Sequence, residues 1–447
     1  DCGILIYDRK SGKKTHRVPF RQEERMGNVY CKYLELKPEN VGYQFYEGER
    51  TVPDLHAQGF LRKPAYGKIR KPADRIAVFP NEDFDWEQDM HPMLPYEDST
   101  CYCLHVRGFT MHASSQVTHR GTFAGVVEKL DYLQELGVGA IWLSPFNDSP
   151  NYDNGYDVSD YYKVMEEAGT MEELEELIAA CEKREIVVMM DLVLNHSSHL
   201  HPWFLEARKD RNSKYHDFYI WKEGTKEQPP EGGGAFFGGS TWEWVPEVQE
   251  YYYHSFSVMQ PDLNWKNPSL RKELYRMIQF WMDKGIRGFR LDAIDNIVKD
   301  GHGGNDTHSE QIHTYLMEMN QNTYGKSEQI LTVGETGGAT VEMAQQYSDP
   351  ESQELSMIFQ FELMGIDGIR SGNWDPKPYT LPQLKQIFEK WQTGLEEKGW
   401  NSLFWGNHDF PRVVSRFGND REPYREKSAK MLAVLLHGMK GTPYIYQ

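Results

Sequence analysis

The sequence predicts an α/β protein whose centre is a (β/α)8 TIM barrel, truncated after the eighth strand, with an inserted domain after strand 3 and an N-terminal β-sandwich. Three observations carry this prediction. From Thr100 onward, apolar runs typical of strands alternate with amphipathic helices, which is the pattern of a parallel sheet built from βα units. Eight such runs occur. Several end abruptly in polar residues, as barrel strands do where they open into an active site.

Residues 1–97 differ from the rest of the chain and are expected to form the separate β-sandwich. Short alternating stretches such as GILIYD and VGYQFYEG are separated there by charged or Gly/Pro turns. A Pro-rich, acidic passage from Pro80 to Glu97 is typical of a linker. The barrel is then expected over 98–196 and 266–447.

The apolar runs predict where the eight barrel strands lie: 101–109, 139–145, 185–194, 286–294, 329–335, 356–363, 402–408 and 442–447. Between them, apolar residues recur on one helical face, for example Leu270, Leu274 and Ile278, which indicates packing against the barrel wall. Because the sequence stops at the eighth run, the final barrel helix is expected to be missing. An apolar flank is then uncovered, which predicts poor stability unless another segment or subunit covers it.

One connection interrupts the alternation of strands and helices. About 70 residues separate His196, at the end of the third strand, from the helix that begins near Pro268. A connection of that length in a compact fold is usually functional. Its residues 197–265 are rich in Trp, Tyr and Phe and include a glycine-rich turn at 232–234. We expect a small inserted domain, domain B, that forms one wall of the active site.

Composition excludes several classes of partner. Asp and Glu outnumber Lys and Arg by 67 to 49, and the resulting charge of −18 repels nucleic acid. No apolar run of about 18 residues occurs, so no membrane span is expected. The five cysteines are irregularly spaced and indicate neither a disulfide framework nor a zinc site, which fits a reducing, cytoplasmic location. Because the first residue is Asp rather than Met, a removed signal peptide stays open.

Four segments carry a resemblance to a known family. In order and spacing, DLVLNH ending at His196, GFRLDAI around Asp292, VGET around Glu335 and GNHD ending at Asp409 resemble the α-amylase family of retaining α-glycoside hydrolases. From about residue 139, QPDLN and NGYDVSDYY are similar to the oligo-1,6-glucosidase and α-glucosidase group. The N-terminal part and LHVRGFTMHASS instead resemble the pullulanase or debranching branch, in which a carbohydrate-binding-like module precedes the barrel. The chain therefore resembles a mosaic.

The chemistry of the central pair can be argued from spacing. Arg290 and Asp292 lie two residues apart on a strand, so both side chains leave the same face and the guanidinium can keep the carboxylate ionised. An ionised carboxylate beside an anomeric carbon is a nucleophile, and the resemblance gives this role to Asp292. It implies that Glu335 is the acid–base residue. Asp409 is implied to be the third carboxylate, which binds ring hydroxyls in the transition state.

The resemblance also implies contacts with the glucose ring. His196 and His408 are expected to bind the same glucose. Tyr156 is expected to stack on the ring, and Asp157 to hold its hydroxyls. Arg412 is expected to pair with Asp157 at the floor of the pocket.

Substrate preference follows from smaller signals. The residue after the nucleophile is Ala293, whereas in the oligoglucosidase group a valine there accompanies α-1,6 cleavage, so the expectation leans to α-1,4 linkages at the end of short oligosaccharides. Four alternatives stay open. They are a transglycosylating sucrose or maltose isomerase, an endo-acting amylase or pullulanase, a non-catalytic amylase-like binding protein, and a glycogen-binding protein led by residues 1–97.

No cofactor or metal is expected. Members of the group usually carry an acidic, glycine-rich cation loop after the first strand, and TMHASSQVTHRGTF stands in its place here. Without clustered carboxylates this segment offers no oxygen cage for a hard cation. The expected partner is an α-glucan or oligosaccharide substrate.

Overall fold

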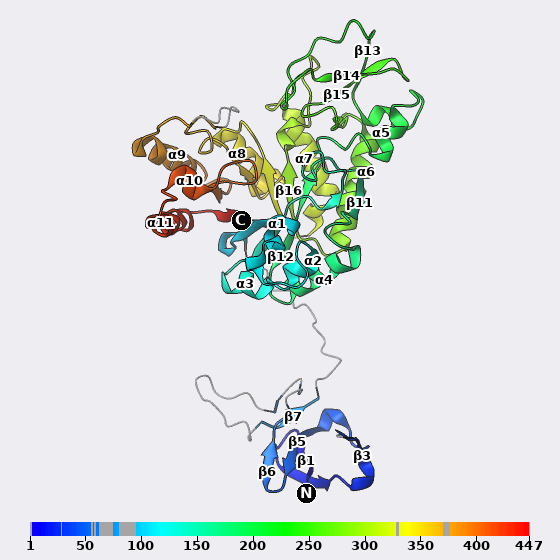
Figure 1. Ribbon diagram of the computed structural model, residues 1–447, viewed down its shortest axis with the longest axis vertical. Coiled ribbons are helices and arrows are strands. Elements are labelled where there is room, and N and C mark those ends of the chain that lie inside the picture. Colours follow the sequence, from blue (N-terminus) through cyan, green and yellow to red (C-terminus); the bar gives the residue numbers. More distant parts are fainter. Residues whose placement is uncertain are drawn as a thin grey trace. The chain divides into compact units, whose positions relative to one another are not determined.

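The computed structural model describes most of the chain, namely residues 2–27, 29–54, 57, 60–61, 75–79, 95–327, 330–369 and 376–446. The chain divides into two compact units, Asp1–His91 and Pro92–Gln447 (Figure 1). The sequence-based boundary at residue 97 lies a few residues later. Most of the predicted linker, Pro80 to Glu97, lies outside the described residues, so its nature stays a prediction.

The N-terminal unit is built on an antiparallel sheet. Its strands are β1 (Cys2–Asp8), β2 (Lys14–Pro19), β5 (Val41–Glu47), β6 (Arg50–Val52) and β7 (Ala77–Val78), with β1 pairing to both β2 and β5. Burial alternates along β5, as a half-buried strand requires. Among the described residues of this unit, the other ladder is the short pair β3 (Arg25–Met26) and β4 (Val29–Tyr30). The second layer of a sandwich stays a prediction.

The second unit is a barrel of eight parallel strands. They are β8 (Cys101–Leu104), β9 (Ala140–Leu143), β12 (Val187–Val193), β16 (Gly288–Asp292), β17 (Leu331–Glu335), β18 (Met357–Phe359), β19 (Ser402–Phe404) and β20 (Thr442–Tyr446). Their order is β18-β17-β16-β12-β9-β8-β20-β19. A parallel bridge from Ile358 to Asn401 and a 2.6 Å bond from Ser402 Oγ to Ile358 O connect the two ends. The predicted barrel is confirmed.

One strand prediction extends too far. The run 101–109 stops being a strand at Leu104, and helix α1 (Val106–Met111) follows. The side chain of His105 accepts a hydrogen bond from Gly108 N at 3.2 Å and so caps this helix. The apolar run had concealed this cap, because a histidine between apolar residues also fits a strand.

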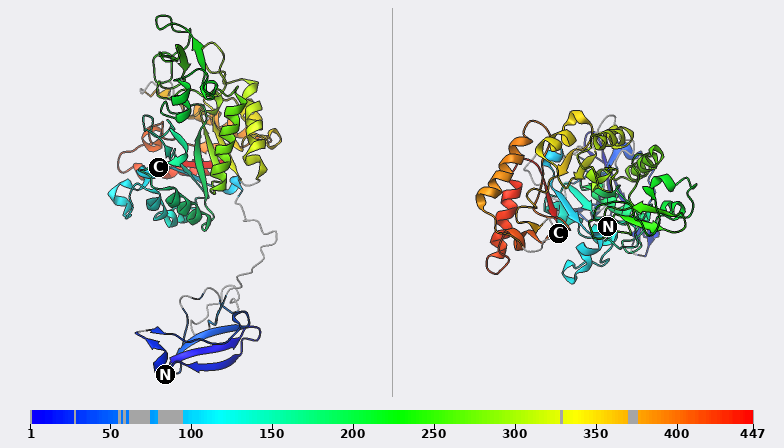
Figure 2. Two further views of the ribbon diagram at one scale, coloured as in Figure 1. Left: turned by 90° about the vertical axis from the view of Figure 1, so that its right-hand side faces the viewer. Right: turned by 90° about the horizontal axis from the view of Figure 1, so that it is seen from above.

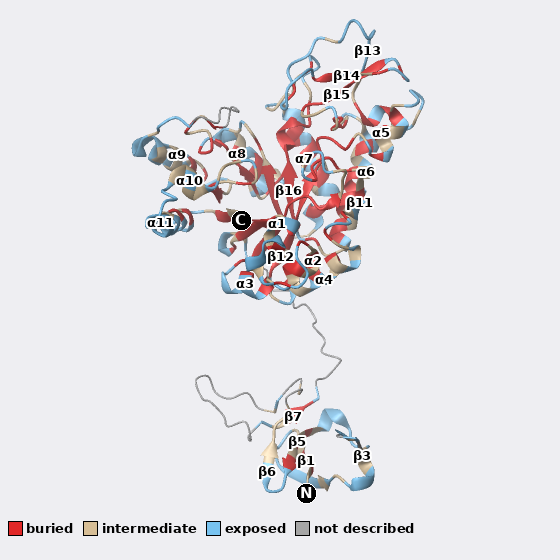
Figure 3. Cartoon of the chain, viewed as in Figure 1, coloured by how far each residue is buried: buried red, intermediate tan, exposed pale blue. Residues whose placement is uncertain are grey.

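Helices surround the barrel (Figure 2). They are α2 (Phe123–Val127), α3 (Leu130–Glu135), α4 (Met171–Glu182), α6 (Pro268–Asp283), α7 (Glu310–Asn322), α8 (Val341–Ser348), α9 (Leu381–Gly394), α10 (Val413–Phe417) and α11 (Arg425–His437). Helix α6 shows why they form: Asn267 caps it, Pro268 occupies its first turn, and Leu270, Leu274 and Ile278 are fully buried on one face. Burial is concentrated in the strands and the inner helix faces (Figure 3).

The connection after β12 folds as an inserted segment. It contains α5 (Pro202–Ala207) and a three-stranded antiparallel sheet of β13 (Trp221–Glu223), β15 (Glu250–Tyr253) and β14 (Trp242–Val245). A second, shorter excursion after β9 is held by the hairpin of β10 (Asn147–Asp148) and β11 (Asp160–Val164). Both bring side chains to the ends of the barrel strands. Within the described part of the chain, no helix has the length and apolar character needed to cross a membrane.

Candidate active site

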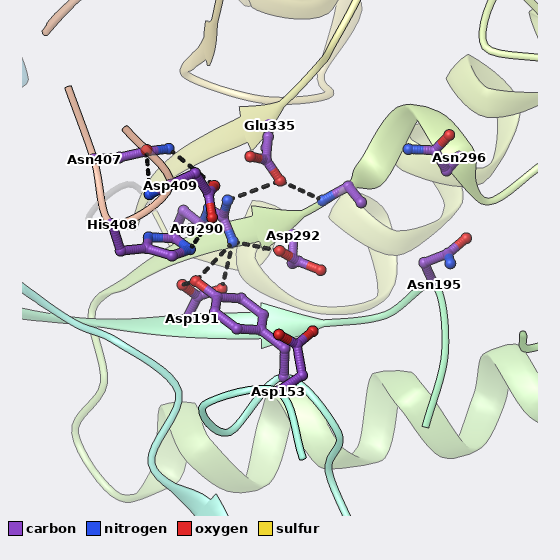
Figure 4. A network of polar contacts seen from close by, with 12 residues as sticks. Asp153, Asp191, Asn195, Arg290, Asp292, Asn296, Glu335, Asn407, His408 and Asp409 are labelled. Atoms are coloured by element: carbon purple, nitrogen blue, oxygen red, sulfur yellow. Dashed lines mark hydrogen bonds and ion pairs between the residues drawn. The ribbon is translucent and has the colours of Figure 1, made fainter. Parts of the chain in front are cut away.

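Arg290 forms the centre of a polar cluster at the carboxyl ends of the barrel strands. Its side chain is 1% exposed. Nη1 lies 2.6 Å from Asp292 Oδ1 and 2.9 Å from Asp191 Oδ1, and Nη2 lies 2.8 Å from Glu335 Oε2 (Figure 4). Parallel pairing aligns Asp191 of β12 with Arg290 of β16, which explains why these two side chains meet. One guanidinium group thus forms ion pairs with three carboxylates.

The charges of this cluster do not cancel. Burial raises the pKa of Asp292 well above its ordinary value, and the nearby guanidinium of Arg290 acts against that rise. Burial also raises the pKa of Asp191, again opposed by Arg290. The Asp191 carboxylate is further held by Tyr156 Oη at 2.9 Å and Trp142 Nε1 at 3.1 Å. Arg290 is therefore the group that favours the ionised form of these buried carboxyls.

Asp292 and Glu335 are the last residues of two adjacent strands, β16 and β17. Between them lies Ala293, whose φ of 42° turns the chain immediately after Asp292. This left-handed turn directs the Ala293 N–H at Glu335 Oε2, 3.0 Å away. The two predicted catalytic carboxyls are therefore fixed by a guanidinium and by a backbone hydrogen bond.

The third predicted carboxylate approaches from the loop after β19. The backbone N–H of Asp409 donates to Asn407 Oδ1 at 2.8 Å, which holds the backbone of this loop. His408 Nε2 lies 3.4 Å from Asp409 Oδ1. The His408 ring stacks on Tyr156 with a centroid distance of 5.1 Å and an interplanar angle of 17°. Figure 4 shows His408 and Asp409 beside Arg290, and the stacking on His408 adds Tyr156 to this group.

His196 is connected to the cluster through Tyr156. It is buried, and its Nε2 lies 3.0 Å from Tyr156 O and 3.1 Å from Gln260 Nε2. Burial lowers the pKa of His196, so the imidazole is neutral near pH 7. Gln260 also donates to Asp153 Oδ2 at 2.8 Å. A neutral imidazole, an amide and a carboxylate together offer both donors and acceptors, which suits sugar hydroxyls.

The structure corrects two expectations about the pocket floor. Asp157 is fully buried, and its oxygens accept from Ser149 Oγ and from the backbone N–H groups of Tyr152 and Asp153, so it shapes the loop instead of facing a ligand. Arg412 does not pair with it. The guanidinium lies 4.6 Å from the ring centroid of Tyr446 and donates to the carbonyl oxygen of that residue at 3.3 Å.

Three polar residues of the cluster, Asp191, Gln260 and Asp153, were not predicted from the sequence. Asp191 begins DLVLNH, and its spacing from the end of β12 was a usable signal, because barrel strands direct alternate side chains inward. Gln260 begins QPDLN and could have been found in the same way, by treating the motif residue by residue. Asp153 lies in an irregular loop that carries no periodicity, so no such signal existed for it.

The Glu128 carboxylate holds the loop that follows α1. The Glu128 carboxylate accepts from Thr118 N at 2.8 Å and from His119 N at 2.9 Å, and His119 Nδ1 is 2.9 Å away. These bonds lower the pKa of Glu128 from 4.5 to about 2. Among the described residues, no group of three or more His, Cys, Asp or Glu could hold a metal ion. The backbone amides of Thr118 and His119 are therefore the main partners of the Glu128 carboxylate.

This loop is expected to loosen in acid. A carboxyl whose folded pKa is depressed stabilises the fold above its unfolded pKa, and that contribution is lost as pH falls from 4.5 through about 2. The protection of residues 112–121 against hydrogen exchange, corrected for the intrinsic exchange rate at each pH, should fall over this range in the wild type. In Glu128→Gln the exchange should already be fast at pH 6 and should change less with pH. Equal profiles for both proteins would contradict the assignment.

Fold and site together define a class: a closed (β/α)8 barrel with an arginine-held set of carboxylates at its strand ends, as in glycoside hydrolases. Comparison with known proteins then gives the family. The family described as "Alpha amylase, catalytic domain" matches residues 103–447. This chain belongs to the alpha-amylase family.

Individual relatives agree with this assignment. The oligo-1,6-glucosidase of Bacillus cereus is 48% identical over 79% of this chain and 65% of its own length. The glucan 1,6-alpha-glucosidase of Streptococcus pneumoniae is 52% identical over 73% of this chain and 60% of its own. The structure of isomaltulose synthase from Klebsiella sp. LX3 is 39% identical, with a TM-score of 0.74, over 79% of this chain and 65% of that protein. The chain thus spans less than two thirds of the length of these relatives.

Proposed function

We propose that the protein hydrolyses terminal α-linked glucose from short oligosaccharides with retention of configuration, and that α-1,6 linkages are its preferred substrates. The observation that carries the proposal is the contact of one guanidinium group, on Arg290, with both Asp292 and Glu335. Such bridging favours the short carboxyl separation of retaining enzymes, about 5–5.5 Å, over the 6.5–9.5 Å of inverting enzymes.

The steps of the reaction follow from this placement. A carboxylate oxygen of Asp292 attacks the anomeric carbon while the glycosidic C–O bond breaks, and Glu335 donates its proton to the leaving oxygen. In the second step Glu335 takes a proton from water, whose oxygen attacks the same carbon and releases Asp292. Asp409, next to His408, is positioned to bind ring hydroxyls as the sugar flattens in the transition state.

The remaining polar groups support a glucose-sized site. Tyr156 presents a ring face already stacked with His408, and Asp153 and Gln260 present a carboxylate and an amide on the same side as His196. Hydrogen bonds to several hydroxyls of one ring are the main source of selectivity for a sugar, because an unmatched polar group in the site is costly. We assign the hydroxyl-binding role first given to Asp157 to Asp153.

The linkage preference rests on the relatives. Two of them carry names that specify 1,6 linkages, which favours α-1,6 over the α-1,4 preference expected from Ala293. The structure also offers another reason for an alanine at this position. Its φ of 42° is a conformation that β-branched residues rarely adopt, so a small side chain relieves the backbone whatever the substrate. Ala293 therefore carries little information about linkage.

Sucrose isomerisation is the second candidate, because isomaltulose synthase shares this fold at 39% identity. The two functions separate in one experiment. Isomaltose, maltose, sucrose and soluble starch are each incubated with the protein, and products are followed by NMR, with Asp292→Asn as the blank. We expect isomaltose to release α-glucose first and fastest. Conversion of sucrose to an isomeric disaccharide would favour the second candidate, and long products from starch would contradict the terminal site.

Two phenylalanine rings, Phe256 and Phe236, connect the site with the surface. The Phe256 ring lies 5.1 Å from His196, and Phe236 stacks on Phe256 at 4.9 Å while remaining 64% exposed. Exposed rings next to a sugar site commonly support the next sugar of the substrate. We propose that Phe236 does so here.

Replacing Phe236 by Ala is therefore expected to raise KM for isomaltotriose about three- to tenfold, since a lost ring contact is worth about 0.5–1.5 kcal/mol. The kcat for the smallest substrate, p-nitrophenyl α-glucoside, should change little. Phe236→Tyr retains the ring and is the matched control. An unchanged KM for isomaltotriose in the alanine variant would remove Phe236 from the substrate path.

A further inference from the structure

Another buried carboxyl, that of Asp295, binds the backbone two residues beyond the proposed acid–base residue Glu335. Asp295 belongs to the short turn Ile294–Asn296 that follows Asp292, and its side chain is 3% exposed. Its Oδ2 accepts from Gly337 N at 2.7 Å, and its Oδ1 accepts from Asn296 Nδ2 at 3.0 Å. Gly337 is two residues beyond Glu335. The turn after the nucleophile is thus joined to the loop after the acid–base strand.

This bond acts together with the one made by Ala293. The Ala293 N–H binds Glu335 Oε2 at 3.0 Å, and the Asp295 carboxylate binds the backbone just past Glu335. Strand pairing between β16 and β17 ends at Leu291 and Gly334, so no ladder hydrogen bond joins these two strands beyond that point, while Glu335 still pairs with Phe359 of β18. The hydrogen bonds made by Ala293 and Asp295 take the place of a ladder bond between these two strands. They lie at the point where the reacting groups must be held to a fraction of an ångström.

We propose that Asp295 is a positioning residue for Glu335: it fastens the loop that follows Glu335 and places a second carboxyl charge beside it. This inference rests on the proposed function, because it assumes that Glu335 is the acid–base group.

The charged surroundings of Asp295 explain why it can act on Glu335. Three titratable side chains face it: Glu335 on β17, Tyr347 on α8, and Lys299 in the loop after the turn. Lys299 is 2.6 Å from Asp262 and is engaged there. Burial, with Glu335 as a further cause, raises the pKa of Asp295 to about 7, while the Gly337 N–H acts against the rise. Asp295 therefore ionises near pH 7, in the neighbourhood of Glu335.

Two substitutions separate the roles of the hydrogen bond and of the charge. Asp295→Asn keeps an oxygen that can accept from Gly337 N–H but removes the charge, so the alkaline limb of the kcat/KM profile for isomaltose should shift to lower pH by about half a unit or more. Asp295→Ala removes both. Its kcat should fall about ten- to a hundredfold with little change in KM, because the acid is no longer held in place.

Glu250→Gln is the matched control, since Glu250 is a buried carboxyl in β15 paired with His216 at 3.0 Å and far along the chain from Glu335. Its pH profile should coincide with the wild type. Hydrogen exchange of residues 336–340 gives a readout that needs no turnover and should accelerate in Asp295→Ala but not in Asp295→Asn.

The outcomes separate this inference from the proposed function. A wild type that cleaves no α-glucoside refutes the proposed function, and the exchange data then still decide whether Asp295 holds the loop. An active wild type whose pH profile and exchange are both unchanged in the two Asp295 variants overturns the inference alone. Loss of thermal stability with an unchanged kcat would show a purely structural residue and would also overturn it.

Discussion

Replacement of Asp292 by Asn is expected to lower kcat on isomaltose by about 10⁴-fold or more, because an amide oxygen cannot form the glycosyl–enzyme bond. The fold should survive. The asparagine occupies the same volume, and Arg290 Nη1, now 2.6 Å from Asp292 Oδ1, can still donate to an amide oxygen. Steady-state kinetics and a thermal melt of the same preparation make the measurement.

Added azide distinguishes a lost nucleophile from a damaged site. In a retaining enzyme that lacks its nucleophile, a small anion can bind in the space that the carboxylate side chain has vacated. The anion can then attack the anomeric carbon from the same face. We expect azide to restore part of the turnover in Asp292→Gly and to yield the β-glucosyl azide. Activity of Asp292→Asn within tenfold of the wild type would contradict the assigned role.

Replacement of Arg290 by Met is expected to have the largest effect on stability. Arg290 is 1% exposed and lies within 2.9 Å of Asp191, Asp292 and Glu335. Removal of one partner from a buried ion pair costs about 3–5 kcal/mol, and here three carboxylates lose their shared cation. Urea unfolding should show this loss, and activity should disappear because a carboxylate without its cation takes up a proton.

Two further variants serve as controls for Arg290→Met. Arg290→Lys keeps the charge but cannot contact three carboxylates through a planar fork, so intermediate stability and low activity are expected. Arg276→Ala removes an arginine whose pair with Glu273 is on the surface, where such pairs contribute about 0–1 kcal/mol. If Arg290→Met unfolded at the same urea concentration as Arg276→Ala, the cluster would not hold the barrel together.

Much of the fold followed from local patterns. Each of the eight predicted strands is present, because a run of apolar residues between turns indicates a buried strand without knowledge of its neighbours. The ends of β16 and β17 also placed Asp292 and Glu335 side by side, since the carboxyl ends of parallel strands meet on one face of a barrel. The match over residues 103–447 confirms the family that the motifs indicated.

The sequence by itself determined the barrel, the family and the strand-borne carboxyls, because alternation along a strand fixes the direction of each side chain locally. Only the tertiary structure decided that Asp157 is bound within its own loop while Asp153 contacts Gln260, that Arg412 lies on Tyr446, and that Asp295 binds the backbone after Glu335. Those side chains lie in turns and loops. Their directions depend on hydrogen bonds between segments far apart in the chain, and no repeating pattern in the sequence encodes such bonds.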